Sequence, residues 1–165
     1  MIGIIADTHG LLRPEVADIF AGVEHIVHAG DVGGAHVLDA LRAIAPVTSV
    51  GGNNDQGSDG TGIVRVTIGE LRILLTHILP RPAKPRRAVV ESLQRKPADV
   101  VVFGHSHLPH NETIGGVTFF NPASAGPRRF DYPIAVGLFD GHTFRHVPLD
   151  ARSVTALTRR MNQMR

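Results

Sequence analysis

Five short apolar stretches of the chain each end abruptly in residues that can bind a metal ion. Carboxylate and amide oxygens occur there together with imidazole nitrogens, a donor set that suits first-row divalent ions. The chain has no cysteine, which excludes a thiolate zinc site and a cysteine nucleophile. The five ends are Asp7-Thr8-His9, Gly30-Asp31, Gly52-Asn53-Asn54-Asp55, Thr76-His77 and Gly104-His105-Ser106-His107.

The number and spacing of these residues favour two ions over one. The strand ends offer seven candidate ligands, which are too many for one catalytic ion and suit a pair that shares a carboxylate. They are Asp7, His9, Asp31, Asn53, His77, His105 and His107. Side chains at i and i+2 of an extended chain point to the same side. Asp7 and His9 could therefore share an ion, and so could His105 and His107 if that loop stays extended. Glycines before Asp31, Asn53 and His105 allow tight turns and close backbone approach.

The first third of the chain alternates between strand and helix patterns. This alternation predicts a parallel sheet with helices packed on it. Ligands bind outside the carboxyl ends of the strands in such sheets, so we expect the five ends to converge. The predicted strands are 1–6, 25–28 and 47–50, and the predicted helices are 13–21 and 35–43.

The rest of the chain is richer in strands. A tight turn is predicted at Gly69-Glu70 and another hairpin turn at Asp140-Gly141. A helix over 86–96 should follow a proline-rich segment. The predicted strands are 62–68, 71–76, 99–103, 112–114, 117–120, 134–140 and 142–148. We expect one domain over 1–150 and a basic tail or short helix over 151–165.

Composition limits the classes of protein that the chain can belong to. Its 165 residues are typical of one domain. No apolar run approaches the ~18 residues of a membrane span, and the amino terminus lacks signal-peptide features, so we expect a cytoplasmic protein without membrane contact. A net charge of only +2 gives little support to nucleic-acid binding. A homodimer is compatible with the sequence.

The five ends resemble, block by block, the signature motifs of the calcineurin-like metallophosphoesterases. The resemblance extends over residues 1–148. The small size and the Asn121-Pro-Ala-Ser124 block resemble the small phosphodiesterases of the YfcE type, a branch that includes retromer subunit 29. This family resemblance implies an α/β fold, a four-layer αββα sandwich of mixed sheets flanked by helices, with a binuclear metal site between the sheets.

The resemblance also implies the role of each ligand. Asp31 would bridge two divalent ions, with Mn²⁺ expected and Ni²⁺, Zn²⁺, Fe²⁺ or Co²⁺ as alternatives. A hydroxide between the ions would attack the phosphate of a small phosphate ester in line. One ion would be held by Asp7, His9, Asp31 and His107, and the second would be completed by Asn53, His77 and His105.

Asn54 marks a departure from the protein-phosphatase members, which have a histidine at that position as general acid. Asparagine can donate a hydrogen bond to phosphate but cannot deliver a proton, so leaving groups that depart easily are favoured. We therefore expect a phosphodiesterase in which Asn54 is a catalytic and substrate-binding residue. Arg128 is a second candidate for substrate binding, and Arg129 could also face the cleft. Ala123 stands where the block would have glycine.

Other functions remain open alternatives. The same fold serves as a scaffold in the retromer subunit, so a catalytically weak binding module is one alternative. A phosphomonoesterase or nucleotide hydrolase is another, and a nuclease is a third. All seven ligand positions carry competent side chains here, which favours an enzyme over a scaffold.

Overall fold

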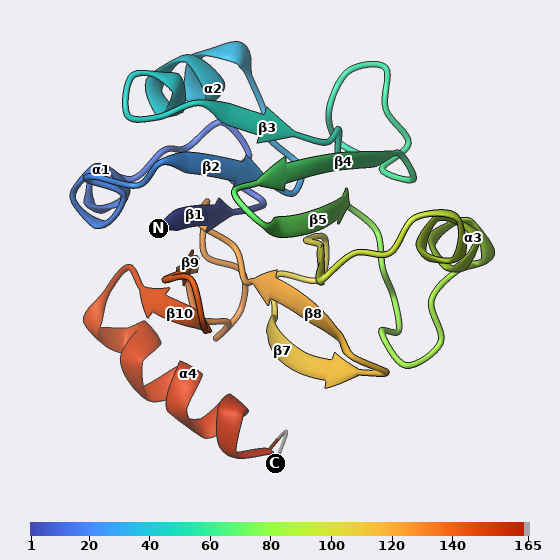
Figure 1. The fold of residues 1–165 in the computed structure, drawn as a ribbon. Helices are drawn as coiled ribbons and strands as arrows, with labels where there is room; N and C mark the ends of the chain where they lie inside the picture. The colour runs from blue at the N-terminus through green and yellow to red at the C-terminus, as the bar shows by residue number, and fades with distance from the viewer. Residues whose placement is uncertain (164–165) are drawn as a thin grey trace.

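Two mixed β-sheets of five strands each lie face to face, with helices on their outer sides (Figure 1). The computed structural model describes residues 1–163. The predicted four-layer αββα sandwich is confirmed. Within the described residues, no helix is both long enough and apolar enough to cross a membrane.

Sheet A contains the first three strands of the chain as parallel neighbours. Its order is β10-β9-β1-β2-β3, and β9 runs antiparallel to β1. The amino-terminal strand therefore lies in the centre of its sheet. The strands are β1 Ile2–Ile5, β2 His25–His28, β3 Val47–Ser49, β9 Ala135–Phe139 and β10 Phe144–Pro148.

Sheet B has the order β4-β5-β6-β8-β7. Its three central strands are parallel and each edge strand is antiparallel to its neighbour. The carboxyl ends of β5 and β6 therefore lie on one edge of this sheet. The strands are β4 Ile63–Ile68, β5 Leu71–Thr76, β6 Val100–Val102, β7 Pro109–Ile114 and β8 Val117–Pro122.

Alternation along the strands assigns side chains to the layers. Ile4 of β1 packs between the sheets with Leu75 of β5, whereas the next residue, Ile5, packs on the outer face. On that outer face Phe20 and Leu41 bring the first two helices against sheet A. The third helix covers the outer face of sheet B. The helices are α1 Glu15–Ile19, α2 Ala35–Arg42, α3 Arg87–Arg95 and α4 Ala151–Gln163.

The carboxyl-terminal helix α4 packs along β10 and β7, which belong to different sheets (Figure 1). Its Leu157 is buried against Ala123 and Ala135. For residues 151–165 the sequence left a basic tail and a short helix as alternatives, and the structure has a helix over Ala151–Gln163. Residues 164 and 165 of the predicted tail lie outside the described residues.

Several predicted boundaries differ from the observed ones. Helix α1 is shorter than the predicted 13–21, because Pro14 occupies the N-cap and the chain turns at Gly22 with φ of 78°. Strand β7 starts at Pro109 rather than at 112. The Gly69-Glu70 turn is confirmed by the pairing of residues 68 and 71. At 140–143 the connection is longer than a two-residue turn, because the Asp140 carboxylate accepts backbone hydrogen bonds from residues 142 and 143.

Candidate metal centre

The ligand-bearing strand ends meet where the two sheets approach each other. Two overlapping groups of described side chains could each hold a metal ion, with donor atoms all within 4.8 Å of one another. One group is Asp7, His9 and His107, and the other is Asp7, Asp31 and His77. Side chains that are up to 100 residues apart in the sequence are therefore brought together.

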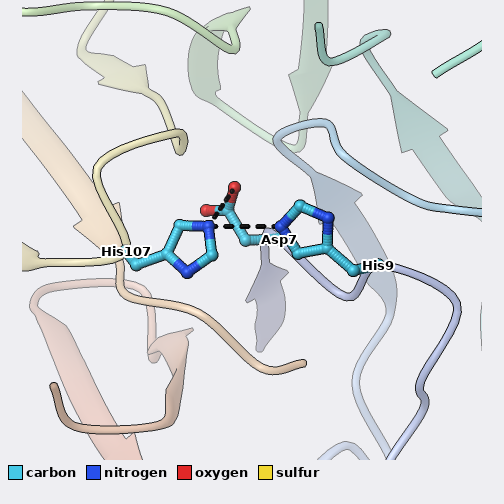
Figure 2. A group of neighbouring side chains, drawn as sticks. All are labelled: Asp7, His9 and His107. Carbon is cyan, nitrogen blue, oxygen red and sulfur yellow. Dashed lines mark hydrogen bonds and ion pairs between the residues drawn. The ribbon is translucent and has the colours of Figure 1, made fainter. Parts of the chain in front are cut away.

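The three residues Asp7, His9 and His107 form what we call the His9 side. The Nε2 atoms of His9 and His107 are 3.2 Å apart. His107 Nε2 is also 3.4 Å from Oδ1 of Asp7, so the three side chains point to a common centre (Figure 2). This side combines residues from both sheets. Asp7 and His9 follow β1 of sheet A, and His107 follows β6 of sheet B.

Asn53, His77 and His105 form the His77 side. The amide oxygen of Asn53 is 3.1 Å from His77 Nε2 and 2.9 Å from His105 Nδ1. His77 Nδ1 is 2.7 Å from the carbonyl oxygen of Ala29, to which it donates a hydrogen bond. That bond fixes the ring and directs Nε2 towards the centre, as outer partners of metal-binding histidines do.

Asp31 lies between the two sides. Its Oδ2 is 3.3 Å from His77 Nε2 and 3.7 Å from His9 Nε2. Asn54 donates to both carboxylate oxygens, from its backbone N–H at 2.8 Å and from Nδ2 at 2.7 Å. Asp7 is the residue that the two metal-binding groups share, so two carboxylates are close to both sides. The bridging role of Asp31 stays a prediction.

The donor chemistry of the His77 side fits a cation. In the neutral His77 ring the proton is on Nδ1, so Nε2 presents a lone pair. That lone pair faces Asn53 Oδ1 and Asp31 Oδ2, which are also acceptors. Metal–ligand bonds of about 2.1 Å place neighbouring ligand atoms about 3 Å apart. A divalent ion would therefore satisfy three acceptors that cannot satisfy one another.

The backbone at the ligands is unusual. Among the described residues, seven non-glycine residues have positive φ, and five of them are predicted ligands: Asp7, His9, Asp31, His105 and His107. Such conformations cost about 1–3 kcal/mol each and cluster at functional sites. The chain is not extended at Asp7-x-His9, and the condition of an extended loop set for His105 and His107 is not met, although Asp7 and His9 do lie in one candidate metal-binding group. The chain instead folds back, with the His9 N–H bonded to Asp31 O at 2.9 Å.

Glycines permit the close approach that was predicted for them. A Cβ atom on Gly52 would lie 2.1 Å from Oδ1 of Asp31. One on Gly30 would lie 2.7 Å from Nδ1 of His77, and one on Gly104 would lie 3.0 Å from Oδ2 of Asp7. The ligands pack directly against backbone, and any side chain at Gly52 would displace Asp31.

A buried hydrogen-bond chain supports the His9 side. The Gly30 N–H donates to His28 Nδ1 at 3.2 Å, so the neutral ring carries its proton on Nε2. That nitrogen is 2.9 Å from the hydroxyl of Thr8, which donates to Val32 O at 2.9 Å. Burial lowers the pKa of His28 to about 4, which keeps the ring neutral. His28 is thus a buried support for the loop that carries Asp7 and His9.

Two further supports were not identified from the sequence. The Asp55 carboxylate accepts backbone hydrogen bonds from Val32, Gly33 and Gly52, joining the loops after β2 and β3. Burial alone would raise the pKa of Asp55, but these donors lower it overall. Ser124 donates from its hydroxyl to Asp7 O at 3.0 Å. Polar residues that follow a strand end serve here as braces as well as ligands.

The Asn121-Pro-Ala-Ser124 block braces the centre from sheet B. Asn121 Nδ2 donates to Gly104 O at 2.8 Å, directly before the His105 loop. Ala123 adopts φ of 77°, the conformation for which glycine is favoured, and its methyl group is buried. The loop therefore keeps the conformation that glycine would favour, at the cost of local strain.

Electrostatics favour uncharged groups at the centre in the absence of a cation. Burial raises the pKa of Asp7 well above its usual value, and the neighbouring Asp31 raises it further. Burial lowers the pKa of His107 to about 4, assisted by Arg129. The pKa of His9 and that of His105 are also lowered, mainly by burial. Neutral imidazoles have lone pairs available for a metal ion, and a cation would stabilise the ionised carboxylate.

Two adjacent arginines have different environments. Arg128 Nη1 donates to Tyr132 O at 2.6 Å, while its Nη2 forms an ion pair with Asp150 and donates to Ser153. Arg129 Nη2 instead lies 3.5 Å from Nε2 of His9. Arg128 thus anchors its loop to α4, and Arg129 is the arginine beside the ligands. A substrate contact by Arg128 stays a prediction.

Comparisons with known proteins agree with this geometry. A protein-family model described as the calcineurin-like phosphoesterase superfamily domain matches residues 1–143. A probable metallophosphoesterase of Methanothermobacter thermautotrophicus is 34% identical over 149 residues, covering 86% of this chain and 87% of the relative. The phosphodiesterase YfcE of Escherichia coli K12 is 27% identical over 177 residues, covering 92% of this chain and 93% of the relative.

Solved structures show the same fold. The structure of the Escherichia coli phosphoesterase YfcE has a TM-score of 0.68 at 26% identity, covering 92% of this chain and 94% of the other. Vps29 of Chaetomium thermophilum has a TM-score of 0.71 at 18% identity, covering 91% and 90% of the two chains. The chain therefore belongs to the calcineurin-like phosphoesterase superfamily, as a small phosphoesterase of the YfcE type.

Proposed function

We propose that this protein is a binuclear metal-dependent phosphodiesterase that hydrolyses a small phosphate ester. The observation that carries the proposal is the meeting of unprotonated donors from both sheets. His77 Nε2 lies 3.1 Å from Asn53 Oδ1 and 3.3 Å from Asp31 Oδ2, while His77 Nδ1 donates to Ala29 O. A divalent cation among these atoms would be a ligand partner for all three.

The two sides of the centre would hold one ion each, with Mn²⁺ as the expected metal. When bound, such ions lower the pKa of water towards 7 and neutralise charge on the phosphate oxygens. Asp31 lies between the sides and would be shared. With water activated in this way, no side chain would have to act as the base. The ligand loops contribute by keeping their donors fixed, which limits reorganisation during the reaction.

Arg129 and Asn54 are the residues proposed to contact the phosphate directly. The Arg129 guanidinium is beside His9 and can pair with a phosphate oxygen. Asn54 Nδ2 donates to Asp31 Oδ2, the side of the carboxylate that faces the histidines. A small movement of this amide would turn its hydrogen bond towards a phosphate oxygen. Neither residue can protonate a leaving group at neutral pH.

The lack of a proton donor at position 54 favours diesters whose alcohol departs easily. The test is a panel of phosphodiesters and phosphomonoesters assayed with each candidate ion, together with elemental analysis of the purified protein. We expect two ions per chain and the highest kcat/KM for an aryl diester with Mn²⁺. Faster hydrolysis of monoesters across the panel would replace the phosphodiesterase assignment with a monoesterase. Metal-free protein without hydrolysis would favour the scaffold alternative.

A further inference from the structure

A pocket of about 500 Å³ opens directly beside the metal ligand His105. This volume falls in the range of about 300–1,000 Å³ that small-molecule sites occupy. Gly104 and Ser106, on either side of the ligand, also line the pocket. A group in this pocket would be adjacent to a substrate phosphate at the metal centre. The group that fits the pocket best in position is therefore another part of the same substrate molecule.

The walls of the pocket are mainly apolar. One wall comes from the segment after β5, including Leu79 and Pro82. A second wall comes from the start of β7 and the residue before it, including Pro109 and Leu108. Phe103 forms part of the base and is almost completely buried. An apolar or aromatic group of a substrate would lose water-exposed surface here, whereas a highly polar one would lose hydration.

Arg86 holds the proline-rich wall in place. Its Nε donates to Ile78 O at 3.0 Å, and its Nη2 donates to Thr61 O at 2.8 Å and to the hydroxyl of Thr76. These bonds connect the end of the 79–85 segment to its start. Together with the restricted backbone of its prolines, they preform the wall before any ligand enters.

The distal end of the pocket disfavours a second anionic group. His110 and Glu112 line it, with His110 Nε2 and a Glu112 carboxylate oxygen 3.3 Å apart. Burial lowers the pKa of His110, so the Glu112 charge there is not balanced by an imidazolium at neutral pH. A carboxylate or a further phosphate in the pocket would be repelled by Glu112.

We propose that this pocket binds an uncharged apolar or aromatic ester group of the substrate while its phosphate lies at the metal centre. The proposal rests on the proposed function and adds the class of diester. Its residues are separate from the ligands except at His105. Selectivity for the ester group would therefore be carried by Leu79, Pro82, Leu108 and Pro109, and turnover by the centre.

The test measures binding of phosphonates, which are not hydrolysed, to protein loaded with Mn²⁺. We expect phenylphosphonate to bind at least about tenfold more tightly than methylphosphonate, because a buried ring removes a large apolar area from water. The anionic 2-carboxyethylphosphonate should gain nothing over methylphosphonate. L108W and P82W, which fill the pocket from two different lining segments, should abolish the phenyl preference and leave methylphosphonate affinity within about twofold.

Val154 on α4 is half exposed and does not line the pocket, so V154W is the matched control and should retain the phenyl preference. Metal content and thermal unfolding of each variant show whether it has folded. Equal affinity for both phosphonates, or a phenyl preference that survives both filling variants, overturns the proposal. The second result would direct attention to the cavity of about 510 Å³ beside Asn54. Phenyl preference without hydrolysis of any ester would remove the proposed function and leave the pocket assignment standing.

Discussion

The two sides of the metal centre are held in place by different physical means. On the His77 side, a direct hydrogen bond from the His77 ring to Ala29 O orients that side chain, and His105 alone of the three residues has a positive φ. On the His9 side, Asp7, His9 and His107 all have positive φ, and His107 Nδ1 is buried without a hydrogen-bond partner among the described residues. The His77 side therefore combines a ring oriented by a hydrogen bond with one strained residue, whereas all three residues of the His9 side have a strained backbone.

The largest effect is expected where the two sides meet. Asp31→Ala removes the carboxylate that lies between His77 and His9, so both sides lose a ligand. We expect kcat/KM for an aryl diester to fall by about a thousandfold or more, because two ions held here would both stabilise the transition state. Asp39→Ala is the matched control, since Asp39 is exposed and pairs only with Arg42. A near-normal rate for Asp31→Ala would refute the shared carboxylate.

Removing one histidine from each side compares the two directly. His77→Ala and His107→Ala should each lower the metal content from two ions towards one per chain, measured by elemental analysis after dialysis. The expected loss of affinity is larger for His77→Ala, because its oriented ring loses least entropy on binding the ion. His142→Ala on the exposed 140–143 loop should keep both ions. Equal losses would mean that backbone strain orients a ligand as well as a hydrogen bond does.

Acidification should weaken the brace of the His9 side. Folded His28 has a pKa of about 4 against 6.5 for the ordinary side chain, so it binds fewer protons when folded. Stability is therefore lost as pH falls from 6.5 to 4, by about 3 kcal/mol for this group. In metal-free protein, His28→Gln should flatten the dependence of unfolding free energy on pH. Asp7, whose raised pKa acts in the opposite direction, is common to both proteins. An unchanged slope would contradict the neutral, buried histidine.

The smallest effect is expected at Asn54. Asn54→His supplies a proton donor next to Asp31, so diesters with poor leaving groups should gain up to about tenfold in rate. The measurement is the dependence of kcat on leaving-group pKa, which should become shallower. Asn54→Ala controls for loss of the amide and should bring no such gain. If the histidine variant keeps the original dependence, the missing acid does not limit the choice of substrate.

The grouping of residues at the centre was predictable because the sequence pattern shows where each strand ends and in which direction it runs. Parallel strands bring their carboxyl ends to one edge, and abrupt changes from apolar to ligand residues mark those ends. The positive φ values of Asp7 and His9 were not predictable, because they arise from hydrogen bonds to the loop after β2. Arg128 and Arg129 could not be told apart either, since an irregular loop has no periodicity and the partners of Arg128, such as Asp150, are distant in the sequence.

The layers were also predictable, since alternation in β1 assigns Ile4 and Ile5 to opposite faces of the sheet. The pairing of the whole sheets was implied by family resemblance alone. Local pattern carries no information on the register between β1 and β9, which are separated by most of the chain. The role of His28 was missed for the same reason, because its partners Thr8 and Gly30 are brought together only by the parallel pairing of β1 and β2.

The central place of β1 in sheet A has a consequence for synthesis of the protein. Strand β1 is bounded on one side by β2 and on the other by β9, which ends at Phe139. A nascent chain can pair β1 with β2 early, but the other edge of β1 stays open until β9 has been made. Closing that edge is a contact of long sequence separation, which slows folding. Until then the open edge of β1 is a site at which a second nascent chain can pair.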